Sequence, residues 1–290
     1  MRALPRPGHD AHLVYDLCIS RVSDPVLKAR LASAAGIVDA MTARFDRAAT
    51  RGKLHEIKSE AVPGVSTAEM EKVYSQRMAR KGAPGRRIYD ALLGAAHNGV
   101  CPLCQQRVAS TLDHFLPKAH YPALVVTPIN LVPACTDCNK SKLDALPRRP
   151  EEVALHPYYD DIDGDTWLVA CVEEEAPSAL VYRVVPPGHW DPVLIHRVQR
   201  HFMTLGLGRL YALQAAEELI NVRYQLGLIH RSAGREGVRT ELKAQHLSCS
   251  RARRNGWRTV AYRAWADSSW FCDGGFAEDF AVQYAAAASA

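Results

Sequence analysis

The sequence lacks long apolar runs. No stretch reaches the roughly 18 or more consecutive apolar residues of a membrane helix. No apolar run of the signal-peptide kind follows Met1-Arg2-Ala3-Leu4-Pro5. We therefore expect a protein that has no membrane anchor and that acts in the cytoplasm.

Several familiar site patterns are also missing. There is no internal repeat, and Gly206-Leu207-Gly208 is too short to indicate a nucleotide loop. The acidic run from Asp160 to Asp165 lacks the closing glutamate of a calcium loop, so we expect a solvated turn. Five histidines have no partner at metal-ligand spacing and are expected in the core or at the surface: His156, His196, His201, His230 and His246.

Strong net charge is absent too, because the formal charge is +5 and the pI about 8.8. Dedicated nucleic-acid-binding domains usually have a pI above about 9. Basic residues nevertheless cluster locally, which favours contact with a phosphate backbone at these places over simple solvation. The clusters are Arg77, Arg80, Lys81, Arg86 and Arg87; then Arg148 and Arg149; and then Arg251, Arg253, Arg254 and Arg258.

The chain has 290 residues, 48% of them hydrophobic, which is enough for one large or two ordinary domains with a real core. Of its eight cysteines, four stand in two close pairs and four are scattered. Scattered cysteines do not define a disulfide framework. We expect these four to be reduced and mostly buried: Cys18, Cys171, Cys249 and Cys272.

The paired cysteines form two C-x-x-C knuckles, Cys101 with Cys104 and Cys135 with Cys138. Four thiolates at this spacing suit the tetrahedral coordination of a structural Zn²⁺. A polar set lies between and beside the knuckles: Asp113, His114, Asn130, Asn139, Lys140 and Lys142. The stretch 101–142 therefore contains two independent signals of chemistry.

These roughly forty residues resemble the HNH, or ββα-metal, endonucleases, in the subgroup braced by a four-cysteine zinc. The D-H pair, the N-L before the second knuckle and the C-x-x-C-N-x-x-K ending have the order and separations of that family. Asn139 stands where the family name expects a second histidine, as it does in other members. The resemblance implies a two-stranded ribbon, a loop and a helix, with Asn130 fixing the loop and hence the ring of His114.

The chemistry of phosphodiester hydrolysis fits the same residues. Neutral His114 can accept a proton from water as a general base. Asp113 and Asn139 offer hard oxygen ligands to one Mg²⁺ or Mn²⁺, which would neutralise charge in the transition state. Because Asp113 and His114 are adjacent, a turn or bulge is needed to aim both at one phosphate. The residues expected to meet DNA phosphates are Lys118, Lys140, Lys142, Arg86 and Arg87.

The predicted fold class is α+β and mainly helical, with a central ββα-metal (HNH) module braced by a four-cysteine zinc and flanked by helices and a small β-hairpin. Helices are expected within 10–50, 67–82, 87–97, 208–231, 234–246 and 257–266 and from Pro192, and strands at 167–172 and 180–185. The expected regions are a helical part (1–98), the HNH module (99–146), and a β-hairpin with a helical C-terminal part (147–290).

The sequence thus predicts a metal-dependent HNH endonuclease that nicks or cuts DNA, with structural Zn²⁺ and catalytic Mg²⁺ or Mn²⁺. The resemblance also suggests an effector of bacterial restriction or anti-phage defence, which could have a partner protein. Two alternatives remain open: a catalytically silent zinc-bearing adaptor that binds nucleic acid or protein, and an HNH nuclease that cleaves RNA.

Overall fold

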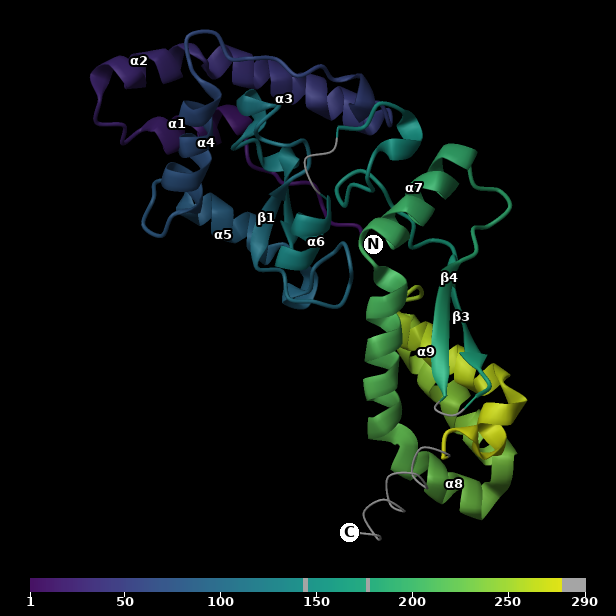
Figure 1. Cartoon of the computed structure of the whole chain (residues 1–290). Helices are drawn as coiled ribbons and strands as arrows, with labels where there is room; N and C mark the ends of the chain where they lie inside the picture. Colours follow the sequence, from purple (N-terminus) through teal and green to yellow (C-terminus); the bar gives the residue numbers. More distant parts are fainter. Residues whose placement is uncertain (143–145, 176–177, 278–290) are drawn as a thin grey trace. The chain divides into compact units, whose positions relative to one another are not determined.

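The computed structural model describes residues 1–142, 146–175 and 178–277, and the chain divides into two compact units, Met1–Ile162 and Asp163–Ala290. Each unit combines helices with one two-stranded antiparallel sheet (Figure 1). The protein is therefore α+β, as predicted. The regions predicted as 1–98 and 99–146 both fall inside the first unit.

The first half of unit 1 is helical, and two of its helices begin at side-chain caps that the sequence pattern indicates. Asp24 accepts hydrogen bonds from the amides of Val26 and Leu27 at the start of α2, and Ser66 with Glu69 forms a capping box at the start of α4. A π-helical turn, η2 (Ser75–Ala79), extends α4. The helices are α1 (Ala11–Ile19), α2 (Pro25–Ser33), α3 (Ala35–Thr50), α4 (Thr67–Tyr74) and α5 (Arg86–Gly94).

The second half of unit 1 contains a strand pair followed by a short helix. Strand β1 (Thr111–His114) pairs antiparallel with β2 (Leu131–Ala134), and α6 (Thr136–Lys142) follows directly. Five short 3₁₀ turns connect the described parts of the unit: η1 (Leu54–Glu56), η3 (His97–Gly99), η4 (Pro122–Leu124), η5 (Pro128–Asn130) and η6 (Pro150–Glu152).

One apolar core joins both halves of unit 1, because side chains of α1, α3 and α4 pack with those of β1, β2 and the loop between the strands. His156 lies in this core, stacked on Phe115 with ring centroids 4.1 Å apart. One of its ring nitrogens bonds to the carbonyl of Ile129 and the other accepts from the amide of Tyr158. The prediction of a structural role for His156 is thus confirmed.

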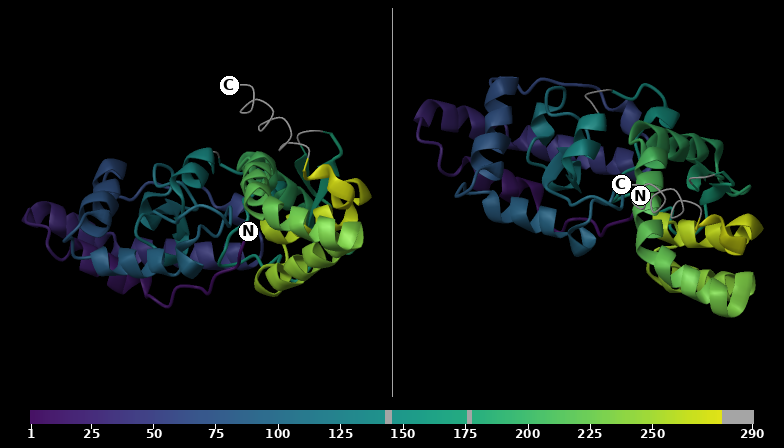
Figure 2. Two further views of the ribbon diagram at one scale, coloured as in Figure 1. Left: turned by 90° about the horizontal axis from the view of Figure 1, so that it is seen from below. Right: turned by 60° about the horizontal axis from the view of Figure 1, so that its bottom comes forward.

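Unit 2 consists of a hairpin and helices. Strands β3 (Leu168–Glu173) and β4 (Ala179–Val184) pair antiparallel, as predicted. The helices are α7 (Pro192–Thr204), α8 (Leu207–Ala252) and α9 (Trp257–Asp267), followed by the π-helical turn η7 (Phe271–Gly275). Within α8, Gly234 has a φ of 62° and a ψ of −165°, which interrupts the helix as the separate segments 208–231 and 234–246 predicted. Figure 2 shows the resulting bend in α8 from two further directions.

A buried asparagine ties the hairpin of unit 2 to the helices. Asn255 Oδ1 accepts from the amides of Trp167 and Leu168, and its Nδ2 donates to the carbonyl of Asp165. Tyr182 on β4 donates to the carbonyl of Trp257 at the start of α9. These bonds satisfy polar groups that would otherwise be buried without partners.

Two sequence expectations need correction. The helix expected over 87–97 ends at Gly94, because Asn98 has a positive φ of 54° and the intervening residues turn towards the first cysteine knuckle. The scattered cysteines are all free, as expected, but only Cys18 and Cys272 are buried. Cys171 is exposed on the hairpin, where every second side chain faces solvent.

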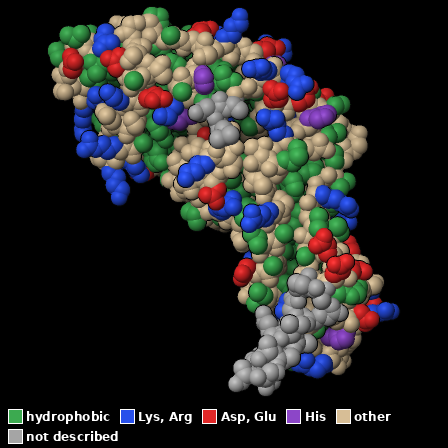
Figure 3. Space-filling model, in the orientation of Figure 1, with side chains coloured by type: hydrophobic (Ala, Val, Ile, Leu, Met, Phe, Trp, Pro, Cys, Tyr) green, Lys and Arg blue, Asp and Glu red, His purple; other side chains and the backbone are tan. Residues whose placement is uncertain are grey.

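The surface charges and the helix hydropathy exclude two simple interpretations, a uniformly basic face in the view of Figure 3 and a membrane-spanning helix among the described residues. On the face shown in Figure 3, Lys and Arg side chains are interspersed with Asp and Glu side chains rather than gathered in one uniform patch. Among the described residues, no helix is both long and apolar enough to cross a membrane.

Candidate functional site

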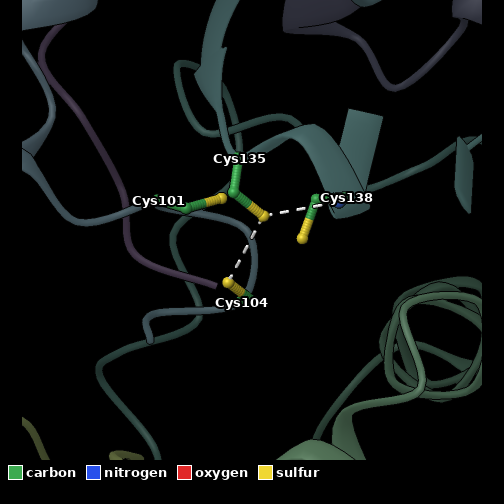
Figure 4. A group of neighbouring side chains, drawn as sticks. All are labelled: Cys101, Cys104, Cys135 and Cys138. Carbon is green, nitrogen blue, oxygen red and sulfur yellow. Dashed lines mark hydrogen bonds between the residues drawn. The ribbon is translucent and has the colours of Figure 1, made fainter. Parts of the chain in front are cut away.

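The four knuckle cysteines converge on one point inside unit 1. Their sulfur atoms all lie within 4.8 Å of one another, and all four residues are buried (Figure 4). Cys104 Sγ and Cys135 Sγ, from different knuckles, are 4.0 Å apart. In the described part of the chain, no other group of three or more His, Cys, Asp or Glu side chains comes close enough to hold an ion.

Backbone amides point at the sulfur atoms in both knuckles. The amide of Arg107 donates to Cys104 Sγ and that of Cys138 to Cys135 Sγ, each at 3.4 Å. A positive φ of 55° at Gln105 lets the first knuckle turn sharply. Hydrogen bonding between Cys101 and Cys104 lowers the pKa of the Cys104 thiol and raises that of the Cys101 thiol.

A salt bridge joins the two knuckles, because Arg107 Nε lies 2.9 Å from Asp137 Oδ2. Four buried sulfurs with amide donors and this brace fit a closed, tetrahedral site. The cysteine group could therefore hold a metal ion such as Zn²⁺.

His114 is the last residue of β1, opposite Leu131 in the register of the sheet. Its Nε2 lies 2.9 Å from the carbonyl oxygen of Val125, in the loop between the strands. A carbonyl can only accept, so Nε2 carries the proton and Nδ1 keeps a free lone pair. The ring also meets Tyr74 of α4 edge to face, with centroids 4.4 Å apart. The imidazole is thus held on two sides in one tautomer.

Burial favours the neutral form of this imidazole. It lowers the pKa of His114 to about 4, and the positive charges of Lys118 and Lys142 act in the same direction. A histidine with this pKa is unprotonated at neutral pH. It can therefore accept a proton at Nδ1.

Asp113 precedes His114 on β1 and is only 6% exposed. Lys142 reaches it from the end of α6, with Nζ 2.8 Å from Asp113 Oδ2 and 2.8 Å from the carbonyl oxygen of His114. The same ammonium lies 4.8 Å from the centroid of the Phe115 ring. The carboxylate therefore lies beside the backbone of His114, with a cation in contact with both.

Asn139 stands on α6 directly after Cys138, and it is half-buried. Residues three apart on a helix lie on the same face, so Asn139 shares the face from which Lys142 reaches Asp113. One short helix thus carries Cys138 of the four-cysteine group, the amide of Asn139 and the ammonium of Lys142.

Asn130 closes the loop between the strands and is fully buried. Its Oδ1 accepts from the amide of Leu116 at 2.7 Å, and its Nδ2 donates to the carbonyls of Leu116 and Leu124 at 3.1 and 3.2 Å. Leu124 immediately precedes Val125, whose carbonyl holds His114. The side chain of Asn130 therefore braces the segment that orients the imidazole.

We predict that Asn130→Ala lowers the free energy of unfolding by about 2–4 kcal/mol, because it leaves the buried amide of Leu116 without its acceptor. Urea unfolding would measure the loss. Asn221→Ala, at an exposed position of α8, is the matched control and should change stability by less than about 0.5 kcal/mol. Equal stability of the two variants would show that the loop does not depend on Asn130.

The five predicted phosphate-contacting residues have different surroundings. Arg86 binds Asp90 at 2.8 Å, donates to the carbonyl of Ala79 and covers the Tyr89 ring, so it stabilises α5. Lys118 lies 3.5 Å from Glu71, and Lys142 is held by Asp113. Arg87 and Lys140 are both exposed to solvent. Contact of these five residues with DNA stays a prediction.

Tyr74 and Val125 belong to the surroundings of His114, although nothing in the sequence indicates it. Tyr74 comes from a helix 40 residues earlier, and Val125 contributes a backbone carbonyl that any residue would supply. No local pattern marks either residue. The contact between Lys142 and Asp113 was also not predicted, because a lysine near a phosphate-binding site is expected to point towards the phosphate.

The structure defines an α+β protein with two small antiparallel hairpins and a buried four-cysteine group that could hold a metal ion. No protein-family model and no solved structure matches the chain. Protein ea31 of Escherichia phage lambda is 31% identical to it over 231 residues, which cover 73% of this chain and 76% of that protein. The chain belongs to the family of protein ea31.

Proposed function

We propose that this protein is a metal-dependent HNH endonuclease that hydrolyses phosphodiester bonds of DNA. The observation that carries the proposal is the state of His114: a largely buried, neutral imidazole that is fixed through Nε2, with its Nδ1 lone pair available, next to a buried carboxylate. A neutral imidazole in a fixed tautomer is what a general base requires. The β1–β2–α6 order supports assigning these residues to a ββα-metal module.

In this proposal His114 Nδ1 takes a proton from water, and the resulting hydroxide attacks phosphorus as the leaving sugar oxygen departs. Val125 and Tyr74 keep the ring oriented during proton transfer. Asn130 does so indirectly by bracing the loop. The base step alone would be worth roughly 10² to 10⁴ in rate.

Asp113 and Asn139 would hold a catalytic Mg²⁺ or Mn²⁺, which supplies Lewis-acid stabilisation of the charge on the phosphate when bound. A carboxylate and an amide oxygen are hard ligands, and Mg²⁺ uses few protein ligands and keeps several waters. The buried position of Asp113 and the place of Asn139 on α6 are compatible with this donor set. The cysteine group would hold Zn²⁺ and fix α6 relative to β1.

DNA as the substrate is part of the proposal, supported by the solvent-accessible basic residues Arg87 and Lys140 on α5 and α6. The biological setting predicted from the sequence, restriction or anti-phage defence with a partner protein, stays a prediction. The family relative is a phage protein, and its name describes no activity.

A time course on supercoiled plasmid tests the function. We expect the purified protein to convert it to the nicked circle with Mg²⁺ or Mn²⁺ and not without divalent metal, because one module supplies one scissile site. Zinc content is measured in every sample, so that loss of the catalytic ion is not confused with loss of the zinc frame.

Other outcomes of the same kind of experiment distinguish the alternative functions. Cleavage of single-stranded RNA with intact plasmid would replace DNA by RNA as the substrate. Binding of nucleic acid without cleavage of either polymer, in protein that retains its zinc, would reject the nuclease and favour an adaptor.

A further inference from the structure

Lys142 has an unusual position for a lysine of a nucleic-acid-binding protein, because its charged group points into the site. The Lys142 side chain is 18% exposed and that of Asp113 is 8% exposed. Nζ is shared between Asp113 Oδ2 and the backbone carbonyl of His114, both at 2.8 Å, and lies over the Phe115 ring. A carboxylate, a carbonyl and an aromatic face together make a small cation site, and Lys142 fills it.

This site has an electrostatic reason to be filled. An ionised carboxylate that is buried without a partner carries a large desolvation penalty. The ammonium of Lys142 neutralises Asp113 and is itself satisfied by two oxygens and the ring. Lys142 therefore keeps Asp113 charged and oriented.

A divalent cation bound at Asp113 would need the position beside the carboxylate that the Lys142 ammonium now occupies. Two cations in contact with one carboxylate repel each other strongly in a partly buried site. Lys142 is the last residue of α6 and carries a flexible four-carbon stem, so its ammonium can leave without any change in β1. The carboxylate cannot move in the same way, since it is placed by the register of β1 with β2.

We propose that Lys142 is a resident counter-ion that occupies the Asp113 site until a divalent cation displaces it. The displaced ammonium would then face the phosphate that the metal binds. This inference rests on the proposed function, because it requires Asp113 to be the metal ligand. Lys142 would thus bind two partners in sequence, first the carboxylate of Asp113 and then the phosphate of the substrate.

The competition predicts that removing the ammonium tightens metal binding. We expect Lys142→Met to lower the Kd for Mn²⁺ by about tenfold, whereas a lysine that only positions Asp113 would give weaker binding when removed. Titration of Mn²⁺ followed by the electron paramagnetic resonance of free ion measures the Kd without any enzymatic turnover. Lys140→Met, a change of a second lysine on the same helix, controls for a general loss of positive charge and should leave the Kd within about twofold.

A second measurement uses the wild-type protein, in case Lys142→Met does not fold. Acetylation by an amine-reactive ester, followed by mass spectrometry, should show that Mn²⁺ increases modification of Lys142 and leaves that of Lys140 unchanged. Protection of Lys142 by Mn²⁺, or no change, would overturn the displacement.

The outcomes separate this inference from the function on which it rests. If wild type binds Mn²⁺ and Lys142→Met binds it equally or more weakly, the counter-ion role is wrong and the metal site remains. If neither protein binds Mn²⁺, both the inference and the metal site at Asp113 are wrong.

Discussion

Cys101→Ser is expected to abolish zinc binding and to unfold the region 101–142. Structural zinc contributes about 10 kcal/mol or more of apparent binding free energy in small sites, and this energy is available only when all four thiolates converge. The sulfur atoms here come from two knuckles that are separated by the strand pair, so loss of one ligand also loosens β1 from α6. Elemental analysis and thermal unfolding measure the two effects. Cys104, Cys135 and Cys138 should behave in the same way.

Two other cysteines of the chain provide matched controls. Cys18→Ser places a hydroxyl in a site that is as fully buried as that of Cys101, but away from the cluster. It should cost no more than about 1–3 kcal/mol and leave the zinc content the same as in the wild type. Cys171→Ser, at an exposed position, should change neither the free energy of unfolding nor the zinc content. Wild-type protein without stoichiometric zinc would reject the assignment of the cluster to Zn²⁺.

The parts of the fold that were predictable are those fixed by neighbours in the sequence. Asp24, Ser66 and Asp191 each cap the helix that their sequence pattern indicates, because a cap needs only the next three residues. The interruption of α8 at Gly234 and the β3–β4 hairpin are equally local. The spacing of the two C-x-x-C knuckles predicted a cluster of sulfur atoms, and they do converge.

The parts that were not predictable depend on contacts between distant residues or on the direction of a side chain. Tyr74, the last residue of α4, contacts the His114 ring and donates a hydrogen bond to the carbonyl of Leu112 on β1, and the sequence does not encode these contacts in any short pattern. Lys142 and Lys140 are both lysines of one helix, yet Lys142 binds Asp113 and Lys140 keeps part of its surface in solvent. Helical periodicity separates their directions, but it cannot indicate which direction faces a carboxylate.

His114→Ala is expected to reduce DNA cleavage by a factor of about 10² to 10⁴ while metal and DNA binding persist, because a general base is not needed to hold the ion. Initial nicking rates at saturating Mg²⁺ and Mn²⁺ titrations measure the two properties. His120→Ala, which removes a partly buried histidine from the loop between β1 and β2, is the control and should retain both. Raising the pH should partly rescue His114→Ala, since hydroxide increases tenfold per pH unit and replaces the missing base.

The roles of the neighbouring residues make this prediction specific. Asp113→Ala should lose Mn²⁺ binding together with activity, and it also leaves Lys142 without its carboxylate. Asn139→Ala should weaken Mn²⁺ binding less than Asp113→Ala does, because an amide oxygen is a weaker ligand than a carboxylate, and Asn139→His should keep activity with Mn²⁺. In the wild type, the pKa of His114 is lowered from an ordinary value of about 6.5 to about 4. The base therefore stays unprotonated even at a pH well below 6.5. Loss of metal binding in His114→Ala with retention in Asp113→Ala would invert the assignment, making His114 the ligand and leaving the base unidentified.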